Sequence, residues 1–565
     1  AEADDGYVAA GPEEEGQWVT LSEIPLLPKN QLYGSAIQAI SRAIVQHYGS
    51  RGYIGINVSP HPEDLNNEAS DVRPEGVDAL RLLVEIGRVT EIRTVASGDR
   101  VPDEDRVNHP KHQTLVDRSP VQPGVTDDPD RNDLLRKDAL DNYVAWLNRH
   151  PGRRVDVAVS PAMEPGGVAL DLMVTENKPW LIYFQASNTG TDQTSEWRER
   201  FGFNHYQLTG NDDILTLDYI TASFDQAHTF LGSYEAPFFD LDRVRWRAHG
   251  TYSEFTASDV GFADEEFRGQ EWSAGGDLIA NIFQDRELFI DLMGGIKWQH
   301  NETVNEVVNT EGETDYFLPH IGARLERYTE ESNTLAEVDV EFHFGSVADN
   351  DPLQVEFMGR LLPDDSFTRM TWLANHSFYL EPVLWRDEWL DASTPESSTL
   401  AHELAFNFRG QYSPDRLVPQ FQRTAGGLHS VRGYDESLTS GDSVILATAE
   451  YRFHLPRIFG IQPDPAQLLG KPFRYAPQQP YGRPDWDLVL SGFFDYGHTF
   501  NSDRLAVETN HQLMSKGVGA EFLFKRNLNI RVDWGYVLDT VTTSGGTDLA
   551  ERGDSRVHFS ATLLY

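Results

Sequence analysis

Apolar and polar residues alternate with a period of two from Trp180 to the C-terminus, a pattern that predicts β-strands. About sixteen such stretches follow one another, separated by polar or Gly/Asp/Asn-rich segments. The last stretch has one apolar and one polar face: Val557, Phe559, Ala561, Leu563 and Tyr565 against Arg556, His558, Ser560 and Thr562. Because a spanning strand needs only about 9–11 residues, we predict that 179–565 forms a 16-stranded antiparallel transmembrane β-barrel with its apolar face toward lipid. A soluble β-sandwich would also alternate, but the number and length of the strands weigh against it.

The chain before Lys178 mixes helical and strand patterns. Apolar residues recur at helical spacing over 31–48 and again over 133–148, and each helix is followed by short alternating stretches. These are 80–86 and 89–95, turned at Gly87, and later 155–160 and 168–176. With 17–21 as a first strand, we predict α+β modules at 17–97 and 131–178. The second module could also begin before residue 131. A tail, 1–16, precedes them, and a Pro-, Asp- and His-rich linker or loop, 98–130, separates them.

The amino-acid composition argues against several kinds of protein. No run of about 18 apolar residues is present, so we expect no transmembrane helix. The absence of cysteine excludes disulfides and thiolate metal sites, and the net charge of −42 argues against a nucleic-acid partner. The acidic start, AEADDGYVAAGPEEEG, is typical of a mature chain whose export signal has been removed. No motif indicates a catalytic residue, a cofactor or a metal ligand, so we predict a protein that is not an enzyme.

The segment 413–441 joins the eleventh and twelfth predicted strands and carries the most informative motif. If the first strand begins and the last strand ends on the periplasmic side, this segment is the sixth extracellular loop. Gly426, Gly427 and Gly433 allow tight backbone turns, and the tetrapeptide Val431-Arg432-Gly433-Tyr434 carries a permanently charged guanidinium. A charge buried in the lumen needs a partner, because an unpaired one costs several kcal/mol.

Alternation selects the candidate partners of Arg432. In the stretch 485–500 the apolar residues define the outward face, which leaves Asp495 on the inward face, two residues before Gly497. The glycine leaves room for a loop to approach. Glu450 on the preceding strand is a second inward carboxylate. Alternation by itself leaves both partners open.

The segment 420–436, the sequence Phe493-Phe494-Asp495-Tyr496-Gly497 and the two N-terminal modules together resemble the two-partner secretion transporter family (TpsB, the haemolysin secretion/activation type). The resemblance implies that both N-terminal modules are POTRA modules. It also implies that Arg432 binds Asp495 and fixes the loop in the lumen, with Phe493 and Gly497 as the strand motif.

The resemblance further implies a Gram-negative outer-membrane transporter with its POTRA modules in the periplasm. They would capture an unfolded, adhesin- or haemolysin-like exoprotein in extended form, and the lumen would conduct it. The other partners implied are outer-membrane lipid and the barrel-assembly machinery, which would act through the C-terminal strand ending at Tyr565. The alternative is an assembly insertase. A further alternative is a porin or structural barrel without a protein client.

Two segments depart from the family pattern. The tail 1–16 is too short, acidic and Gly/Pro-broken for the helix that plugs the barrel in many members. The connection 456–484 contains seven prolines, which disfavour regular strands, yet it is too rich in apolar residues for a free linker. We predict a periplasmic insert that packs under the barrel against the second module.

Overall fold

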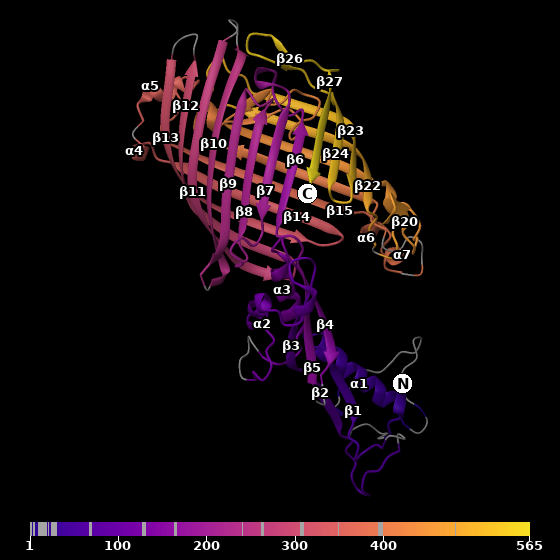
Figure 1. Ribbon diagram of the computed structural model, residues 1–565. Helices are drawn as coiled ribbons and strands as arrows, with labels where there is room; N and C mark the ends of the chain where they lie inside the picture. The colour runs from indigo at the N-terminus through magenta and orange to yellow at the C-terminus, as the bar shows by residue number, and fades with distance from the viewer. Residues whose placement is uncertain are drawn as a thin grey trace. The chain divides into compact units, whose positions relative to one another are not determined.

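The computed structural model divides into two compact units, Ala1–Lys178 and Pro179–Tyr565 (Figure 1). The structure describes residues 3, 6–9, 20, 22–23, 31–66, 70–126, 132–162, 167–239, 241–260, 265–305, 310–348, 350–391, 393, 399–480 and 482–565. Most of the predicted tail 1–16 and strand 17–21 therefore lies outside the described residues. Among the residues described, we find no helix with the length and apolar content needed to cross a membrane.

The first module of the N-terminal unit contains one helix and a two-stranded sheet. These elements are α1 (Gly34–Gly49), β1 (Ile56–Pro60) and β2 (Leu82–Ile86). Strands β1 and β2 are antiparallel, with Val58 opposite Val84. The helix lies within three residues of its predicted bounds, because the apolar spacing over 31–48 is helical.

The second module is a three-stranded sheet with helices packed on it. Its elements are β3 (Arg88–Ser97), α2 (Gln113–Asp117), α3 (Lys137–Asn148), β4 (Arg154–Pro161) and β5 (Gly167–Thr175), with the short 3₁₀ turns η2 (Asp103–Asp105) and η3 (Pro110–His112). The strand order is β3-β5-β4, with β3 parallel and β4 antiparallel to β5. The core of this module draws on every one of its main elements: Val89, Ile92, Leu115, Val121, Leu135, Leu140, Tyr143, Leu147, Val155, Leu170, Leu172 and Val174.

The predicted boundaries between the modules are wrong in two respects. Strand β3 pairs with β5 of the second module, not with β2 across Gly87. The segment 98–130 is not a plain linker, because Leu115 and Val121 are buried in the second core. Two short apolar stretches around a glycine look like a hairpin in sequence, but the choice of partner strand depends on the tertiary fold.

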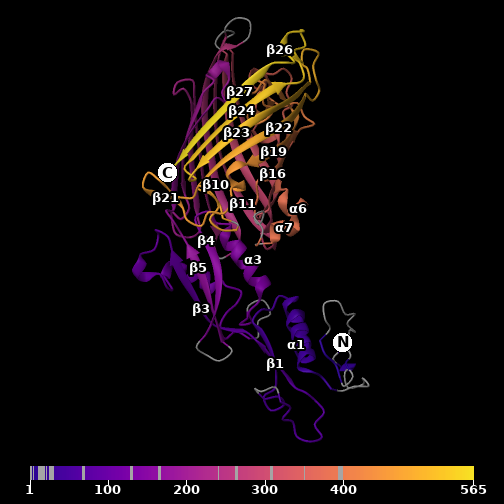
Figure 2. The same cartoon turned by 90° about the vertical axis from the view of Figure 1, so that its right-hand side faces the viewer.

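The second unit is a closed antiparallel barrel of sixteen strands among the described residues, as predicted. The strands are β6 (Trp180–Ser187), β7 (Arg198–His205), β8 (Ile214–Ala222), β9 (Ala227–Phe238), β10 (Leu241–Val260), β11 (Glu265–Asp285), β12 (Leu288–Asn305), β13 (Thr310–Tyr328), β14 (Ser332–His343), β15 (Phe367–Tyr379), β16 (His402–Tyr412), β19 (Ser443–His454), β22 (Trp486–Phe500), β23 (His511–Phe524), β24 (Leu528–Val537) and β27 (Ser555–Leu564). Each pairs with its neighbours in chain order, and β27 closes on β6. Figure 2 shows β22, β23, β24 and β27 in succession along the wall.

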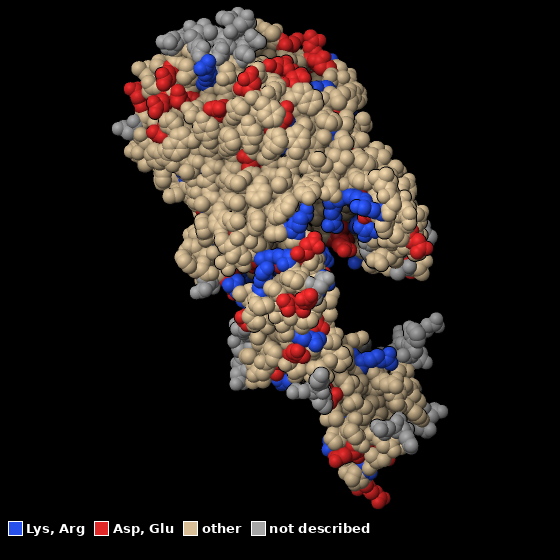
Figure 3. Space-filling model, in the orientation of Figure 1, with Lys and Arg blue, Asp and Glu red and all other residues tan. Residues whose placement is uncertain are grey.

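The two faces of the wall differ as alternation predicts. On β24, Trp534 is exposed on the outside while Asp533 is buried; on β27, Val557 is exposed and His558 is buried. In Figure 3 a broad, almost uncharged band crosses the visible wall, and acidic residues gather toward the rim at the top of the view. Such a band is suited to contact with lipid hydrocarbon.

The barrel has two ends, which its connections distinguish. The near end is where Trp180 and Tyr565 meet, with ring centroids 5.8 Å apart; the far end is opposite. Far-end connections include 344–366 with α4 (Gly345–Ala348) and α5 (Pro352–Phe357), 413–442, 501–510, and 538–554 with β25 (Val541–Thr542) and β26 (Asp548–Ala550). Near-end connections include 380–401 with α6 (Glu381–Leu384) and α7 (Arg386–Leu390), and 455–485 with η7 (Leu455–Ile458), β20 (Ala466–Leu468) and β21 (Lys471–Phe473).

The proline-rich connection 456–484 is ordered by contacts with the barrel. It contains a small hairpin of three-residue strands, β20 and β21, despite Pro472. The ring of Phe473 stacks on Phe524 at 5.6 Å, and Tyr475 stacks on Trp486 at 5.3 Å. Its contact with the second module stays a prediction.

Candidate functional site

The connection between β16 and β19 folds back into the barrel. It begins with η6 (Pro419–Phe421) and forms a hairpin of β17 (Arg423–Ala425) and β18 (Thr439–Gly441). Beyond the hairpin, Val431, Arg432 and Tyr434 are all buried. Val431 and Tyr434 pack with residues of the barrel wall such as Leu446 and Leu513. Burial on this scale means that the loop occupies the lumen.

Arg432 lies at the centre of a group of carboxylates on the inner wall. Its Nε and Nη2 donate to the two oxygens of Asp495 at 2.8 and 2.9 Å, and its backbone N–H donates to the same carboxylate at 3.1 Å. Its Nη1 donates to Glu450 at 2.8 Å and to Asp533 at 3.1 Å. The guanidinium fork therefore joins three neighbouring or near-neighbouring strands, β19, β22 and β24, to one loop residue.

The charges of this cluster are balanced. Arg452 donates to Glu450 at 2.8 Å, and Arg531 donates to Asp533 at 2.6 Å. Three arginines thus face the three carboxylates Glu450, Asp495 and Asp533. Since Asp495 is fully buried, a missing arginine would leave a carboxylate without compensation in a low-dielectric site.

Shape as well as charge fits the loop to the wall. The guanidinium of Arg432 lies over the ring of Phe493, 3.3 Å from its centroid. A side chain at Gly497 would have its Cβ 2.7 Å from Val431, and one at Gly433, where φ is +95°, would meet Gly535 at 2.9 Å. Glycine is required at these positions because the loop and the wall approach too closely for a Cβ.

Two further contacts hold the loop beyond Arg432. The backbone N–H of Gly433 donates to Nε2 of His558 at 2.9 Å. The hydroxyl of Tyr434 donates to the carbonyl of Asp539 at 2.7 Å and accepts from the N–H of Met514 at 3.2 Å. The loop is therefore bound to β23 and β27 as well as to the three strands of the charge cluster.

Glu436 supports the turn of the loop. Its carboxylate accepts from the backbone N–H of Leu428 at 2.6 Å, and a side chain at Gly427, where φ is +99°, would collide with it. Burial raises the pKa of Glu436 to about 7, although the Leu428 hydrogen bond and the nearby charges of Arg198 and Arg409 act in the opposite direction. His558, 3.8 Å away, also faces this carboxyl.

We expect the seating of the loop to depend on pH through Glu436. A carboxyl whose pKa rises in the seated state stabilises that state fully below its unseated pKa, near 4.5, and loses this contribution as pH rises through about 7. Protease digestion of the loop in reconstituted barrels should therefore accelerate between pH 5 and 8. The variant Glu436→Gln, which stays neutral, should remove most of this change; an unchanged profile would contradict the assignment.

A second buried ion cluster lies at the far end of the barrel, where the loop leaves and rejoins the wall. Arg360, in the connection 344–366, donates to both oxygens of Asp442 at 2.5 and 2.9 Å and to Glu508 at 3.0 Å. Arg416 also donates to Glu508 at 2.7 Å. We call Arg360, Arg416, Asp442 and Glu508 the far-end clasp; it joins the start and end of the loop to two other connections.

Backbone groups also converge on the clasp. Asp442 accepts from the N–H groups of Leu417 at 3.0 Å and Ser502 at 2.8 Å. Burial opposes ionisation of Glu508, but hydrogen bonds from Arg416 and Arg360 outweigh it and hold its pKa at about 2. Glu508 therefore stays ionised over the whole physiological pH range.

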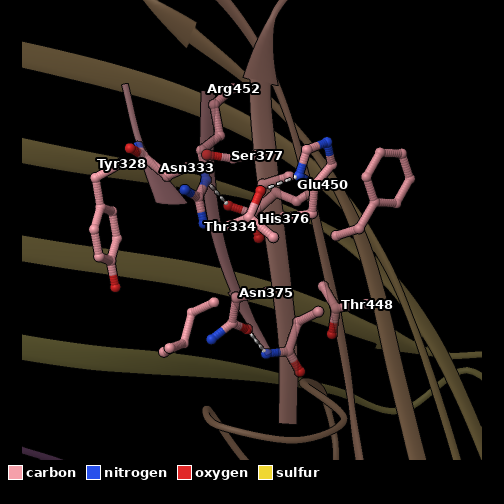
Figure 4. A pocket seen from close by; sticks show the side chains of 13 residues that line it. Tyr328, Asn333, Thr334, Asn375, His376, Ser377, Thr448, Glu450 and Arg452 are labelled. Carbon is pink, nitrogen blue, oxygen red and sulfur yellow. Dashed lines mark hydrogen bonds and ion pairs between the residues drawn. The ribbon is translucent and has the colours of Figure 1, made fainter. Parts of the chain in front are cut away.

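The lumen beside the charge cluster is not completely filled. A cavity of about 320 Å³ lies against Glu450 and Arg452, and polar side chains such as Asn333 and Asn375 line the rest of it together with apolar ones such as Phe406 (Figure 4). The lining residues belong to β13, β14, β15, β16 and β19. A cavity of mixed polarity thus remains beside the charge cluster.

The structure brings together most of the residues that the sequence singled out. Arg432, Asp495, Phe493 and Gly497 meet in one cluster, and Glu450 joins it as the other inward carboxylate. Sequence reasoning did not identify Asp533 as a partner of Arg432, nor His558 as a partner of Gly433. Alternation placed both side chains inward, but only the closure of the barrel brings β24 and β27 to the loop.

One protein-family model matches the part of the chain that contains the loop. The family model of the haemolysin secretion/activation protein ShlB/FhaC/HecB matches residues 390–462, which include the whole of 413–441. No curated protein sequence matches the chain. The family match confirms the resemblance to two-partner secretion transporters that the sequence motifs indicated.

Solved structures share the fold at low sequence identity. CdiB from Escherichia coli aligns with a TM-score of 0.64 and 15% identity, over 99% of this chain and 89% of that one. CdiB from Acinetobacter baumannii aligns with a TM-score of 0.57 and 15% identity, over 94% and 82%. BamA from Haemophilus ducreyi lacking POTRA domains 1–3 aligns with a TM-score of 0.50 and 14% identity, over 99% and 100%. The fold is therefore that of a sixteen-stranded barrel preceded by α/β modules.

Proposed function

We propose that this two-partner secretion transporter exports a large, adhesin- or haemolysin-like exoprotein through its lumen. The observation that carries the proposal is the loop bound in the barrel by Arg432, Asp495 and their neighbours. A loop joined to the wall by ion pairs can be displaced as a unit, which would open the lumen to a client. Surface detection of the exoprotein in cells with and without this gene tests the proposal, and equal surface levels would contradict it.

The proposed orientation puts the far end outside the cell and the N-terminal unit in the periplasm. Loop 413–441 then enters the lumen from outside, and the client enters from the near end. Outer-membrane lipid surrounds the wall, and the barrel-assembly machinery inserts the chain through β27 and its terminal Tyr565. The acidic rim in Figure 3 then faces the medium.

We infer that the client adds to an open sheet edge of the second module. In the strand order β3-β5-β4, the described residues of β4 pair on one side only, with β5. The edge strand β3, in contrast, is partly covered by the segment 106–108, because Ala96 donates to the carbonyl of Arg106. An extended client could therefore pair with β4 through its main chain, without a fixed sequence.

Cross-linking should distinguish the β4 edge from the rest of the sheet. The chain has no cysteine, so Val159→Cys on β4 gives a single reactive site. Met173→Cys on the central strand β5 is its control, since these two side chains are 47% and 45% exposed. We expect a client arrested during export to cross-link at position 159 and much less at position 173. Equal cross-linking at both positions would contradict edge pairing.

An assembly insertase is the second candidate, and one observation favours it. The closing strands pair only between Ser560–Leu564 and Tyr183–Ser187, the shortest ladder in the described barrel. A short seam could open to accept a new strand. A disulfide across it, Ala186→Cys with Ala561→Cys, directly opposite in register, would stop an insertase and leave luminal secretion intact.

A further inference from the structure

The connection 380–401 at the near end carries an apolar surface that the transport mechanism does not use. Its helices α6 and α7 expose Val383, Leu384 and Leu390 at 63%, 60% and 52%. Trp385, between the helices, is also exposed. We call residues 381–390 the near-end shelf; Figure 1 and Figure 2 show it at the bottom of the barrel.

The shelf is firmly attached to the wall. The buried carboxylate of Glu381 accepts from the N–H groups of Ala401 at 2.6 Å and His402 at 3.0 Å, where β16 begins. The N–H of Leu380 donates to the carbonyl of His402 at 2.8 Å. The side chain of Trp389 is buried beneath the helices. The exposed apolar residues therefore belong to an ordered segment with a fixed orientation.

Ring contacts place the shelf on the outer side of the wall. Trp385 lies against His402, with ring centroids 6.4 Å apart. On β16 the inward residues are Glu403 and Gln411, which are buried, and the outward residues include Phe406 and Phe408, which are exposed. His402 is an even number of residues from Phe406 and Phe408 and therefore lies on the same outward face. It forms a hydrogen bond of 2.6 Å with the outward Tyr451 of β19. Trp385 thus continues the row of side chains that faces lipid.

The neighbouring near-end connection, 455–485, also has aromatic rings on the outer side of the wall. Its rings of Phe473 and Tyr475 stack on Phe524 and Trp486, which share the outward parity of the exposed Val518 and Leu490. Leu469, at the tip of its hairpin, is 97% exposed. Two successive connections therefore place apolar and aromatic groups outside the rim rather than across the lumen.

We propose that the near-end shelf inserts into the phospholipid leaflet at the near end of the barrel. Its exposed apolar residues would lie at the acyl boundary, Trp385 at the level of the headgroups, and Arg386, Asp387 and Glu388 in water. This division is the one expected of an amphipathic interfacial segment, with an indole at the interface. Lipid is the occupant because the shelf is continuous with the lipid-facing wall.

Site-directed spin labelling tests the proposal on the full-length protein in vesicles of phosphatidylethanolamine and phosphatidylglycerol. Nitroxides are attached to the single-cysteine variants Leu384→Cys and Leu390→Cys. Asp387→Cys is the matched control on the shelf, and Phe408→Cys is the lipid-facing reference on β16. Collisions with oxygen report lipid, and collisions with a water-soluble nickel chelate report water. Electrophoretic mobility without heating shows that each variant is folded.

We expect the ratio of oxygen to nickel accessibility at positions 384 and 390 to exceed that at 387 by about fivefold or more and to approach the value at 408. Nickel accessibility equal to that at 387 would show that water covers the shelf. Low accessibility to both reagents would show that protein covers it, either the N-terminal unit or a second copy. Each of these results overturns the proposal. The measurement needs no client, so it is independent of the proposed secretion activity.

Discussion

Replacing Arg432 with alanine is expected to lower the surface level of the exoprotein by about tenfold or more, because removal of one partner from a buried ion cluster costs about 3–5 kcal/mol. The loss falls on the loop, since every strand of the wall keeps its ladder hydrogen bonds. Barrel assembly should therefore stay nearly intact. Ion conductance across planar bilayers should rise, because Asp495, Glu450 and Asp533 would no longer hold the loop in the lumen.

The control for Arg432→Ala is Arg324→Ala. Arg324 is also an arginine on the barrel wall and donates to Glu337 at 2.8 Å, but within the described part of the chain it makes no hydrogen bond or ion pair with the loop. Its loss should leave secretion and conductance close to those of the unmodified protein. Arg432→Lys keeps the charge but not the planar fork that serves three carboxylates, so we expect an intermediate secretion level. Wild-type secretion by Arg432→Ala in correctly folded barrels would refute the role of the loop.

Replacing Arg360 with alanine is the second change with a large expected effect. It would leave Asp442, which is fully buried, without its bidentate partner and remove one of the two arginines that hold Glu508. The cost should again be about 3–5 kcal/mol, because both side chains of the pair are almost inaccessible to water. We expect a lower temperature for the heat-induced shift in electrophoretic mobility and faster proteolysis at 413–420, with Arg432 still in place.

Arg552→Ala is the matched control for the far-end clasp. Arg552 is exposed in the connection 538–554 at the same end of the barrel, outside the clasp. Its replacement should leave the mobility shift and the rate of proteolysis unchanged. If Arg360→Ala behaves like Arg552→Ala, the clasp contributes nothing to the loop, and Arg432 with its neighbours holds it without help from the far end.

Much of the barrel could be predicted from residue order alone. Alternation is a local property, and in a membrane barrel it must match the two solvents, lipid outside and water within. The number of strands, the outward Val557, and the inward Asp495 and Glu450 therefore followed from neighbouring residues. The pairing of Arg432 with Asp495 was expected only with the help of the family resemblance, since alternation offered several carboxylates.

Contacts between residues distant in the chain depended on the tertiary structure. Asp533 is 101 residues from Arg432, and its role appears only when the loop enters the closed barrel. Strand β3 could pair with β2 or with β5, and the burial of Leu115 and Val121 favours the second module. In the same way, the apolar residues of 381–390 could have lain on the inner or on the outer side of the wall. The contact between Trp385 and the outward His402 decides this, because the side of the wall on which a connection folds is not encoded by its own alternation.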